Sequence, residues 1–480
     1  MIFVKKMTFL KVFHFVMRLA FGLLASCLLY SCAMEADSYA SSAPVVFQES
    51  EASQREKSWT FIVYMAADNN LEGAAIDDLN EMEESLGAAS MNVLVLLDRA
   101  MGYDSSNYDW TSTRLYKVKN DDEHNKINIA SEQLECPNLC LSLEKETELD
   151  MAKKSTLAGL LSFAWENYPA DHYGLLVWGH GTGWRAENGS SDSAGKTGVF
   201  RAFAVDSSSD SYMTISSMRE AIEEGMGGRK LDFIGFDTCF GVCAESAYEF
   251  RDVAEIMAGT PSIVSSSGWN YTKVFDYFAL EDSELVDLSD SSRGNAKDFA
   301  AACQKQFREQ YQRESSSVFC QIKLSKIQKA INLFDDFAKS AADLIDSYEL
   351  RDKFTEVFQK KSVSYYSSNS STDFYVDLRS VVQNVLEIAP ELSEKGTAFL
   401  KSLDAAVFDS WSANGRETSL GVFYATYASY GVCSTSHPDL YINGGIETGA
   451  SQFVKDCSGY VPTKENSGSL LDKIFYATFD

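Results

Sequence analysis

Histidine is scarce in this sequence, which has five among 480 residues. No histidine stands at ligand spacing from a cysteine pair, although the chain has ten cysteines, so we expect no metal site. The sequence also has no internal repeat and no glycine-rich phosphate-binding motif. These absences argue against a zinc protein, a repeat protein and a P-loop nucleotide-binding protein.

Positive charge is also in short supply. The chain has 42 Lys and Arg against 69 Asp and Glu, which gives a formal net charge of −27. Such a chain repels phosphate backbones and anionic lipids. We therefore expect no nucleic-acid partner and no electrostatic binding to a membrane.

The N-terminal segment has the pattern of an export signal. Residues 1–18 carry four basic residues and no acid, and the apolar stretch LAFGLLASCLLYSC that follows is too short for a stable membrane span. The stretch ends in a small residue followed by cysteine, as in the lipobox of bacterial lipoproteins. Cleavage before Cys32 leaves an apolar core of 13 residues, within the usual length, whereas cleavage before Cys27 leaves eight. We predict a signal peptide over 1–31 with lipid on Cys32; plain secretion is the alternative.

Residues 32–57 are rich in Ala, Ser and Glu and have no periodic apolar pattern, which predicts a flexible tether. The mature protein would be exported and would contact a bacterial membrane only through its lipid, facing the periplasm or the cell surface.

Strand and helix patterns alternate between residues 58 and 275. The apolar runs TFIVYMA, NVLVLLD, YGLLVW and LDFIGFD are typical of buried parallel strands, and stretches with helical spacing separate them. This alternation predicts an α/β fold with a mostly parallel central sheet covered on both faces. Residues 276–480 are predicted to form a C-terminal region that is mainly helical with short strands.

Three of these strands end in residues that could do chemistry. Asp68 follows the first strand, His180 the third, and Asp237 and Cys239 the last. Because ligands bind beyond the carboxyl ends of parallel strands, His180 and Cys239 would share one rim of the sheet. An imidazole beside a thiol can lower the thiol pKa and later protonate a leaving amine. The pattern predicts a Cys–His dyad; buried packing is the alternative for a strand-end cysteine.

Two neighbours of the predicted dyad have expected roles. Gly181 lacks a Cβ, so a substrate carbonyl can approach its N–H, which would form an oxyanion hole with the N–H of Cys239. Cys243 is expected one turn into the next helix, packed in the core. Histidines that are less well placed, in loops or at the opposite rim, are His124, His172 and His437.

An apolar strand into His-Gly, then a second into Asp-x-Cys, resembles the clostripain family of cysteine peptidases, relatives of caspases, legumain and gingipains. The resemblance covers residues 57–275 well, in WTFIVYMAADNNLE, YPADHYGLLVWGHGTGW, LDFIGFDTCFG and GWNY. It implies a caspase-like α/β sandwich, His180 and Cys239 as the catalytic dyad, and cleavage of peptides or proteins after Arg or Lys. It also implies that Asp237 lines an acidic S1 pocket, where a buried basic side chain needs a charge partner. A helix cap or a strand-end hydrogen-bonding group is the alternative role for Asp237.

The chain departs from the family pattern in one respect. Family members often carry a second acid before the Gly-Trp pair, whereas this chain reads AGTPSIVSSSGW. The missing acid weakens the expected preference for Arg and Lys. Relatives are often zymogens that cut themselves between the His and Cys segments, and Arg185, Lys196 and Arg201 offer such positions here.

Some relatives also respond to calcium. We expect no required cofactor, although the acidic stretches NDDEHN and LEDSELVDLSDSS could bind calcium weakly without the spacing of an EF-hand loop. The chain is expected to be a monomer.

Two other functions would use the same fold. One is a non-catalytic surface lipoprotein that binds peptides or a partner, against which the intact His-Gly and Asp-x-Cys pairing argues. The other is a transpeptidase, whose thioester chemistry would use the same dyad.

Overall fold

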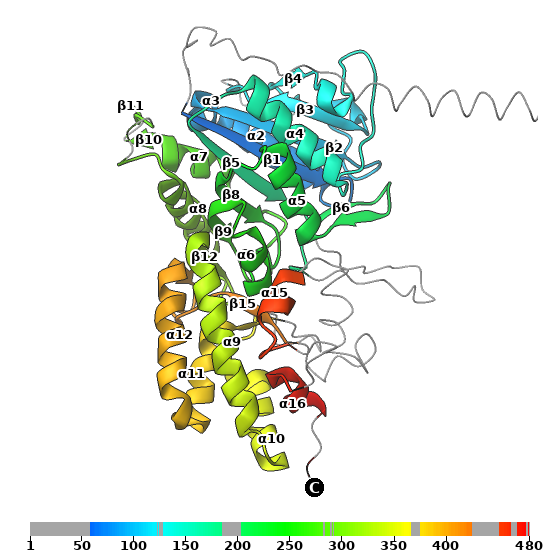
Figure 1. Cartoon of the computed structure of the whole chain (residues 1–480). Coiled ribbons are helices and arrows are strands. Elements are labelled where there is room, and N and C mark those ends of the chain that lie inside the picture. The colour runs from blue at the N-terminus through cyan, green and yellow to red at the C-terminus, as the bar shows by residue number, and fades with distance from the viewer. Residues whose placement is uncertain are drawn as a thin grey trace, which may run out of the picture. The chain divides into compact units, whose positions relative to one another are not determined.

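The computed structural model describes residues 58–184, 203–365, 375–424, 451–461, 468–476 and 479, apart from 122, 124–127, 282, 283, 289 and 291 (Figure 1). These residues belong to one compact unit that spans 55–480. No helix in the described ranges is long and apolar enough to cross a membrane. The predictions that lie outside these ranges concern the signal peptide, the tether, Cys27, Cys32, Arg185, Lys196 and Arg201.

A nine-stranded sheet has the order β14-β12-β9-β8-β5-β1-β2-β3-β4. Its five central strands pair in parallel, and two antiparallel strands flank them on each side. The strands on the N-terminal side of the sheet are β1 (Trp59–Ala67), β2 (Asn92–Arg99), β3 (Thr113–Lys117) and β4 (Glu132–Leu134), and the remainder are β5 (His172–Trp178), β8 (Leu231–Asp237), β9 (Ala254–Gly259), β12 (Val318–Lys323) and β14 (Val407–Ser412). The predicted α/β class with a mostly parallel sheet is confirmed.

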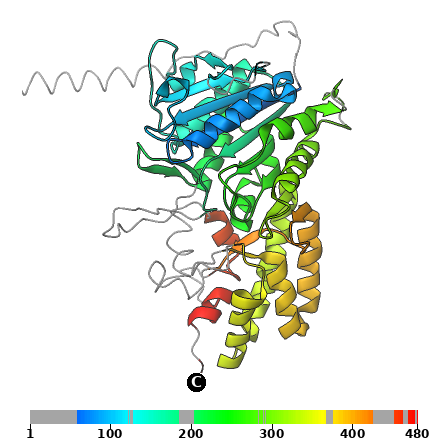
Figure 2. The same ribbon diagram turned by 180° about the vertical axis from the view of Figure 1, so that it is seen from behind.

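Helices cover both faces of this sheet (Figures 1 and 2). Successive residues of a strand point to opposite faces, so Ile62 and Tyr64 belong to one apolar cluster and Phe61 and Val63 to the other. The first cluster is closed by α4 (Lys154–Asn167), α5 (Ile215–Gly225) and α6 (Ala244–Phe250). The second is closed by α2 (Glu72–Glu84), α3 (Leu86–Ser90), α7 (Tyr271–Ala279) and α8 (Ala296–Tyr311). Burial on both faces explains why the central strands read as continuous apolar runs.

The chain beyond residue 275 extends the same sheet. β12 pairs with β9, and β14 pairs with β12. The sequence pattern predicted a mainly helical region with short strands over 276–480, but it did not predict that β12 and β14 join the central sheet. Residue 275, the predicted end of the catalytic domain, lies within α7.

Three long helices, α9 (Ile327–Leu344), α11 (Leu378–Ile388) and α12 (Ser393–Ala406), lie side by side beyond β12 (Figure 2). Their apolar side chains join the cluster that α4, α5 and α6 cover. Smaller elements are the strand pairs β6 (Phe203–Asp206) with β7 (Ser211–Met213), β10 (Leu280–Glu281) with β11 (Glu284–Leu285) and β13 (Tyr375–Asp377) with β15 (Gly421–Phe423), and the helices α10 (Tyr348–Glu356), α15 (Ser451–Asp456) and α16 (Leu470–Tyr476).

The register between β5 and β8 determines which residues follow the ends of these two strands at the same level. Trp178 of β5 pairs with Asp237 of β8. His180 and Cys239 each follow two residues later, so they stand level on adjacent parallel strands. This is the shared rim that the sequence predicted.

Candidate active site

A cavity of about 210 Å³ opens where β5 and β8 end. Its walls bring together His180, Cys239 and Asp237, three residues from segments far apart in the sequence. The other lining residues are Leu71, Trp178, Gly179, Val264, Ser265, Ser266 and Gly268. The cavity is the site that the strand-end pattern predicted.

The Cys239 thiol is half-buried in this cavity. Its sulfur accepts a hydrogen bond from the Val264 N–H (3.4 Å) and lies 3.6 Å from the Val264 carbonyl oxygen, to which the thiol can donate. Burial raises the pKa of the thiol, and the nearby Asp237 charge adds to the increase. Cys239 therefore rests as a neutral thiol and needs a base to become a nucleophile.

The His180 imidazole is held by Asn70, a residue in the turn after β1. Its Nε2 lies 2.9 Å from the Asn70 Oδ1. Because this oxygen only accepts, Nε2 carries the proton, and Nδ1 has the free lone pair of the neutral ring. Burial lowers the pKa of His180, which favours that neutral form. The side chain is thus available as a base, and no hydrogen bond joins it to Cys239 among the described residues.

The turn after Cys239 is braced by the C-terminal part of the chain. Phe240 has a φ of +54°, a left-handed conformation that bulky residues seldom adopt. Its ring stacks on Tyr375 of β13, with ring centroids 5.2 Å apart. The Tyr375 hydroxyl donates to the Thr182 carbonyl at 3.0 Å. One tyrosine from beyond residue 275 therefore contacts both the turn after Cys239 and the loop after His180.

Gly181 lies against the nucleophile segment. A Cβ at this position would collide with the Cys239 carbonyl oxygen and with the Thr238 side chain. Only glycine fits here, for this packing reason. The role of the Gly181 and Cys239 amides stays a prediction.

Asp237 is almost fully buried, yet it lines the cavity. Its Oδ2 accepts hydrogen bonds from the Trp269 N–H (2.9 Å) and the Tyr271 hydroxyl (3.1 Å), whereas Oδ1 has no partner among the described residues. Burial, reinforced by the charge of Glu81, raises its pKa to about 7. A Cβ at Gly268 would collide with this carboxylate, so glycine is needed beside it.

Two acids behind Asp237 were not predicted from the sequence. Both belong to α2 rather than to a strand end, so the strand-end pattern did not indicate them. The buried Asp78 accepts a hydrogen bond from the Trp178 indole (2.6 Å), and burial and the charge of Asp237 raise its pKa. Glu81 accepts from the Tyr271 N–H at 2.8 Å. The segment before Trp269 lines the cavity with serines, as its sequence indicated, so the extra negative charge comes from α2 instead.

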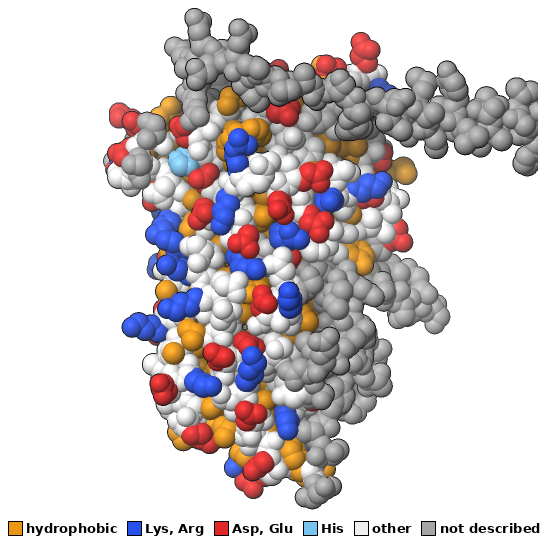
Figure 3. Space-filling model, in the orientation of Figure 1, with side chains coloured by type: hydrophobic (Ala, Val, Ile, Leu, Met, Phe, Trp, Pro, Cys, Tyr) orange, Lys and Arg blue, Asp and Glu red, His pale blue; other side chains and the backbone are white. Residues whose placement is uncertain are grey.

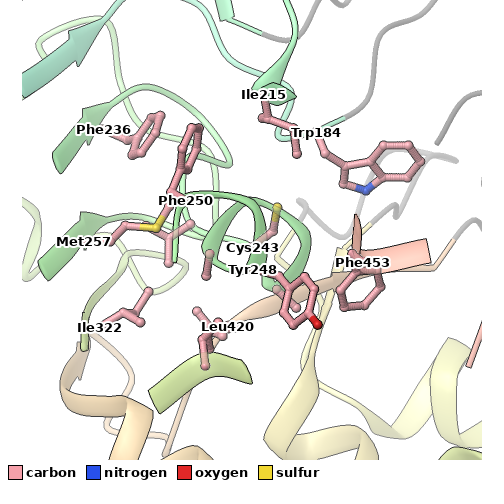
Figure 4. Packing of buried hydrophobic residues seen from close by; sticks show 14 of the residues in the cluster. Trp184, Ile215, Phe236, Cys243, Tyr248, Phe250, Met257, Ile322, Leu420 and Phe453 are labelled. Carbon is pink, nitrogen blue, oxygen red and sulfur yellow. The ribbon is translucent and has the colours of Figure 1, made fainter. Parts of the chain in front are cut away.

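Cys243 has a packing role, but not at the predicted place. It is the N-cap residue of α6 rather than a residue one turn inside it. Figure 4 shows it among buried hydrophobic side chains, and its sulfur lies 3.2 Å from the Ser246 hydroxyl oxygen. Burial raises its pKa well above the usual range. The free cysteines of the described residues also include Cys136 and Cys140.

Comparison with known proteins agrees with this geometry. The sequence model of the clostripain family matches residues 63–433. Clostripain of Hathewaya histolytica is 29% identical over 230 residues, which are 45% of this chain and 41% of that protein. The matched region thus spans about two-fifths of that relative.

Two solved structures cover most of the chain. An inactive zymogen C11 protease from Parabacteroides distasonis has a TM-score of 0.56 at 19% identity, covering 84% of this chain and 98% of that one. A secreted C11 cysteine protease from Bacteroides thetaiotaomicron, in complex with an irreversible peptide inhibitor, has a TM-score of 0.54 at 18% identity, covering 83% and 98%. The caspase-like fold is confirmed, and the chain belongs to the clostripain family of cysteine peptidases.

Asn70 is predicted to be a positioning residue for His180. Asn70→Ala should lower kcat for a peptide substrate about tenfold, the equivalent of one lost hydrogen bond, and leave KM nearly unchanged. Asn70→Asp keeps the acceptor and should retain more activity. Because its charge favours the protonated ring, Asn70→Asp should also move the acidic limb of the kcat/KM profile to higher pH. Equal losses with unmoved pH profiles in both variants would show that Asn70 does not position His180.

Proposed function

We propose that the protein is an exported cysteine endopeptidase, anchored by lipid at Cys32, that cleaves after Arg or Lys. The observation that carries the proposal is one cavity lined by Cys239, His180 and Asp237 together. Cleavage beside a basic side chain needs a nucleophile, a base and a carboxylate that binds the basic group, and this cavity contains all three residue types.

In the proposed reaction, His180 takes the thiol proton and the sulfur of Cys239 attacks the scissile carbonyl. The N–H groups of Gly181 and Cys239 would stabilise the oxyanion. His180 then gives its proton to the leaving amine as the C–N bond breaks, which leaves a thioester on Cys239. Water, activated by His180, hydrolyses the thioester and restores the thiol.

The proposed P1 preference rests on the unpartnered oxygen of Asp237. A buried carboxylate without a cation is costly, and a substrate guanidinium or ammonium group would supply the missing charge. The acids of α2 add negative potential behind it.

Substitution of the two neighbouring cysteines tests the dyad. Cys239→Ala should abolish cleavage of a positional library of Arg- and Lys-containing peptides, because the nucleophile is lost. Cys243→Ala should keep cleavage within about twofold, because this thiol only packs in the core. Equal loss in both variants would contradict the assignment. An added amine acceptor in the same assay distinguishes hydrolysis from transpeptidation.

The raised pKa of Asp237, about 7, gives a pH test of specificity. A carboxyl group with this pKa becomes mostly ionised between pH 6 and 8, so the ratio of kcat/KM for a P1 Arg peptide to that for its P1 Gln analogue should rise over this range. Asp237→Asn should flatten the ratio and lower cleavage after Arg about a hundredfold. Tyr271→Phe removes a hydrogen bond that lowers this pKa, so it should move the midpoint to higher pH. A ratio independent of pH in the wild type would contradict the role of Asp237.

Self-processing is also proposed, at Arg185, Lys196 or Arg201. Purified wild-type protein should convert to two fragments on incubation, while Cys239→Ala stays a single band. Replacement of all three basic residues by Gln should stop conversion without loss of the Cys239 nucleophile. One intact band in wild type and Cys239→Ala alike would exclude self-processing.

A further inference from the structure

The strand pair β13–β15 comes from the C-terminal region, yet it contacts both segments that carry the predicted dyad. On the face that Figure 3 shows, acidic and basic side chains are interspersed, so this face offers no surface of a single sign to a charged partner. The contacts that the C-terminal region makes inside the molecule are therefore the feature that points to a role.

The nucleophile segment pairs directly with β15. Gly421 forms an isolated parallel bridge with Cys243, four residues after Cys239. The Phe423 N–H donates a hydrogen bond to the Oε1 of Glu245 in α6, at 3.0 Å. Both contacts use the backbone of β15, so they fix this strand against the start of α6. Because β13 pairs with β15, the same contacts set the position of β13.

Tyr375 of β13 reaches from this strand pair to both catalytic segments. Its ring stacks on Phe240, the residue after the nucleophile, and its hydroxyl donates to the Thr182 carbonyl in the loop after β5. A Cβ on Gly183 would collide with the same hydroxyl, so the loop has glycine where this side chain passes. Tyr375 is 2% exposed, so water does not compete for these contacts.

We propose that Tyr375 is a positioning residue for the reaction at Cys239. The left-handed backbone of Phe240 is strained for a bulky residue and persists only where its surroundings fix it, and the Tyr375 ring is one of those surroundings. The Tyr375 hydroxyl holds the loop that carries Gly181. The two amides proposed to stabilise the oxyanion, those of Gly181 and Cys239, thus stand on segments that one side chain joins. This inference rests on the proposed function.

Two reactions of the same thiol separate positioning from general disturbance of the site. With a peptide aldehyde, the Cys239 sulfur bonds to the carbonyl carbon and the thiol proton passes to the carbonyl oxygen, which occupies the proposed oxyanion position. With iodoacetamide, the sulfur displaces iodide from carbon and the thiol proton passes to a base, so no oxyanion forms. A residue that positions the oxyanion groups should therefore affect the first reaction and not the second.

Tyr375→Phe removes the hydroxyl and keeps the ring. In the full chain it should lower kcat for a P1 Arg peptide about tenfold with KM nearly unchanged, and weaken inhibition by a P1 Arg aldehyde by a similar factor. Alkylation of Cys239 by iodoacetamide, followed by peptide mass spectrometry, should stay within about twofold of the wild-type rate. Gly183→Ala, which places a methyl group against the same hydroxyl, should reproduce this difference between the two reagents.

Tyr460→Phe is the matched control. It also removes a buried hydroxyl that donates to a backbone carbonyl, that of Phe423 at 2.9 Å. It should lower the Tm about as much as Tyr375→Phe does, and leave kcat and the aldehyde affinity at their wild-type values.

Wild-type values of kcat and aldehyde affinity in Tyr375→Phe would overturn the positioning role and leave the peptidase function standing. Alkylation that slows as much as aldehyde binding weakens would overturn it too, because the substitution would then disturb the thiol itself. A wild-type protein that neither cleaves the peptide nor binds the aldehyde would refute the proposed function, and the positioning role with it.

Discussion

The parallel pairing of β5 with β8 is the interaction on which the candidate site depends. It pairs Trp178 with Asp237, so the segments that contain His180 and Cys239 leave the sheet at the same level. Continuous apolar residues make this pairing possible, since helices must bury both faces of these strands. A slip by one residue would move every side chain of β8 to the opposite face and separate Cys239 from His180. The chemistry is therefore a consequence of strand register.

Buried negative charge is the second constraint. Asp237 lines the cavity with Asp78 behind it, and the buried Asp68 and Asp98 lie further along the same rim. In both places burial raises the pKa of carboxyl groups that have no cation beside them. Folding tolerates such groups poorly, and beside Cys239 the proposed basic side chain of a substrate would supply the missing positive charge.

The parallel strands and the shared rim of His180 and Cys239 could be predicted from the sequence because both have local signatures. Each strand is a continuous apolar run, and His180 and Cys239 each lie two residues beyond the end of such a strand. Asn70, Asp78 and Tyr375 could not be predicted, since their importance arises only from packing. Asp78 reaches the site because α2 packs on the face of the sheet to which Trp178 points, and Tyr375 because β13 returns from the C-terminal region. β12 and β14 were missed because short strands lie between long helical patterns. The proximity of Asp68, Asp98 and Glu148 could not be predicted, because these residues come from three separate segments.

Covalent labelling of the thiol tests the proposed dyad most directly. A peptide with a P1 Arg and a thiol-reactive acyloxymethyl ketone should modify wild-type protein at one position, and mass spectrometry should map that label to Cys239. Labelling should be strongly reduced in His180→Ala and with a P1 Glu peptide. A label on another cysteine, or none at all in folded wild-type protein, would contradict the claim that Cys239 and His180 form a working dyad beside an acidic pocket.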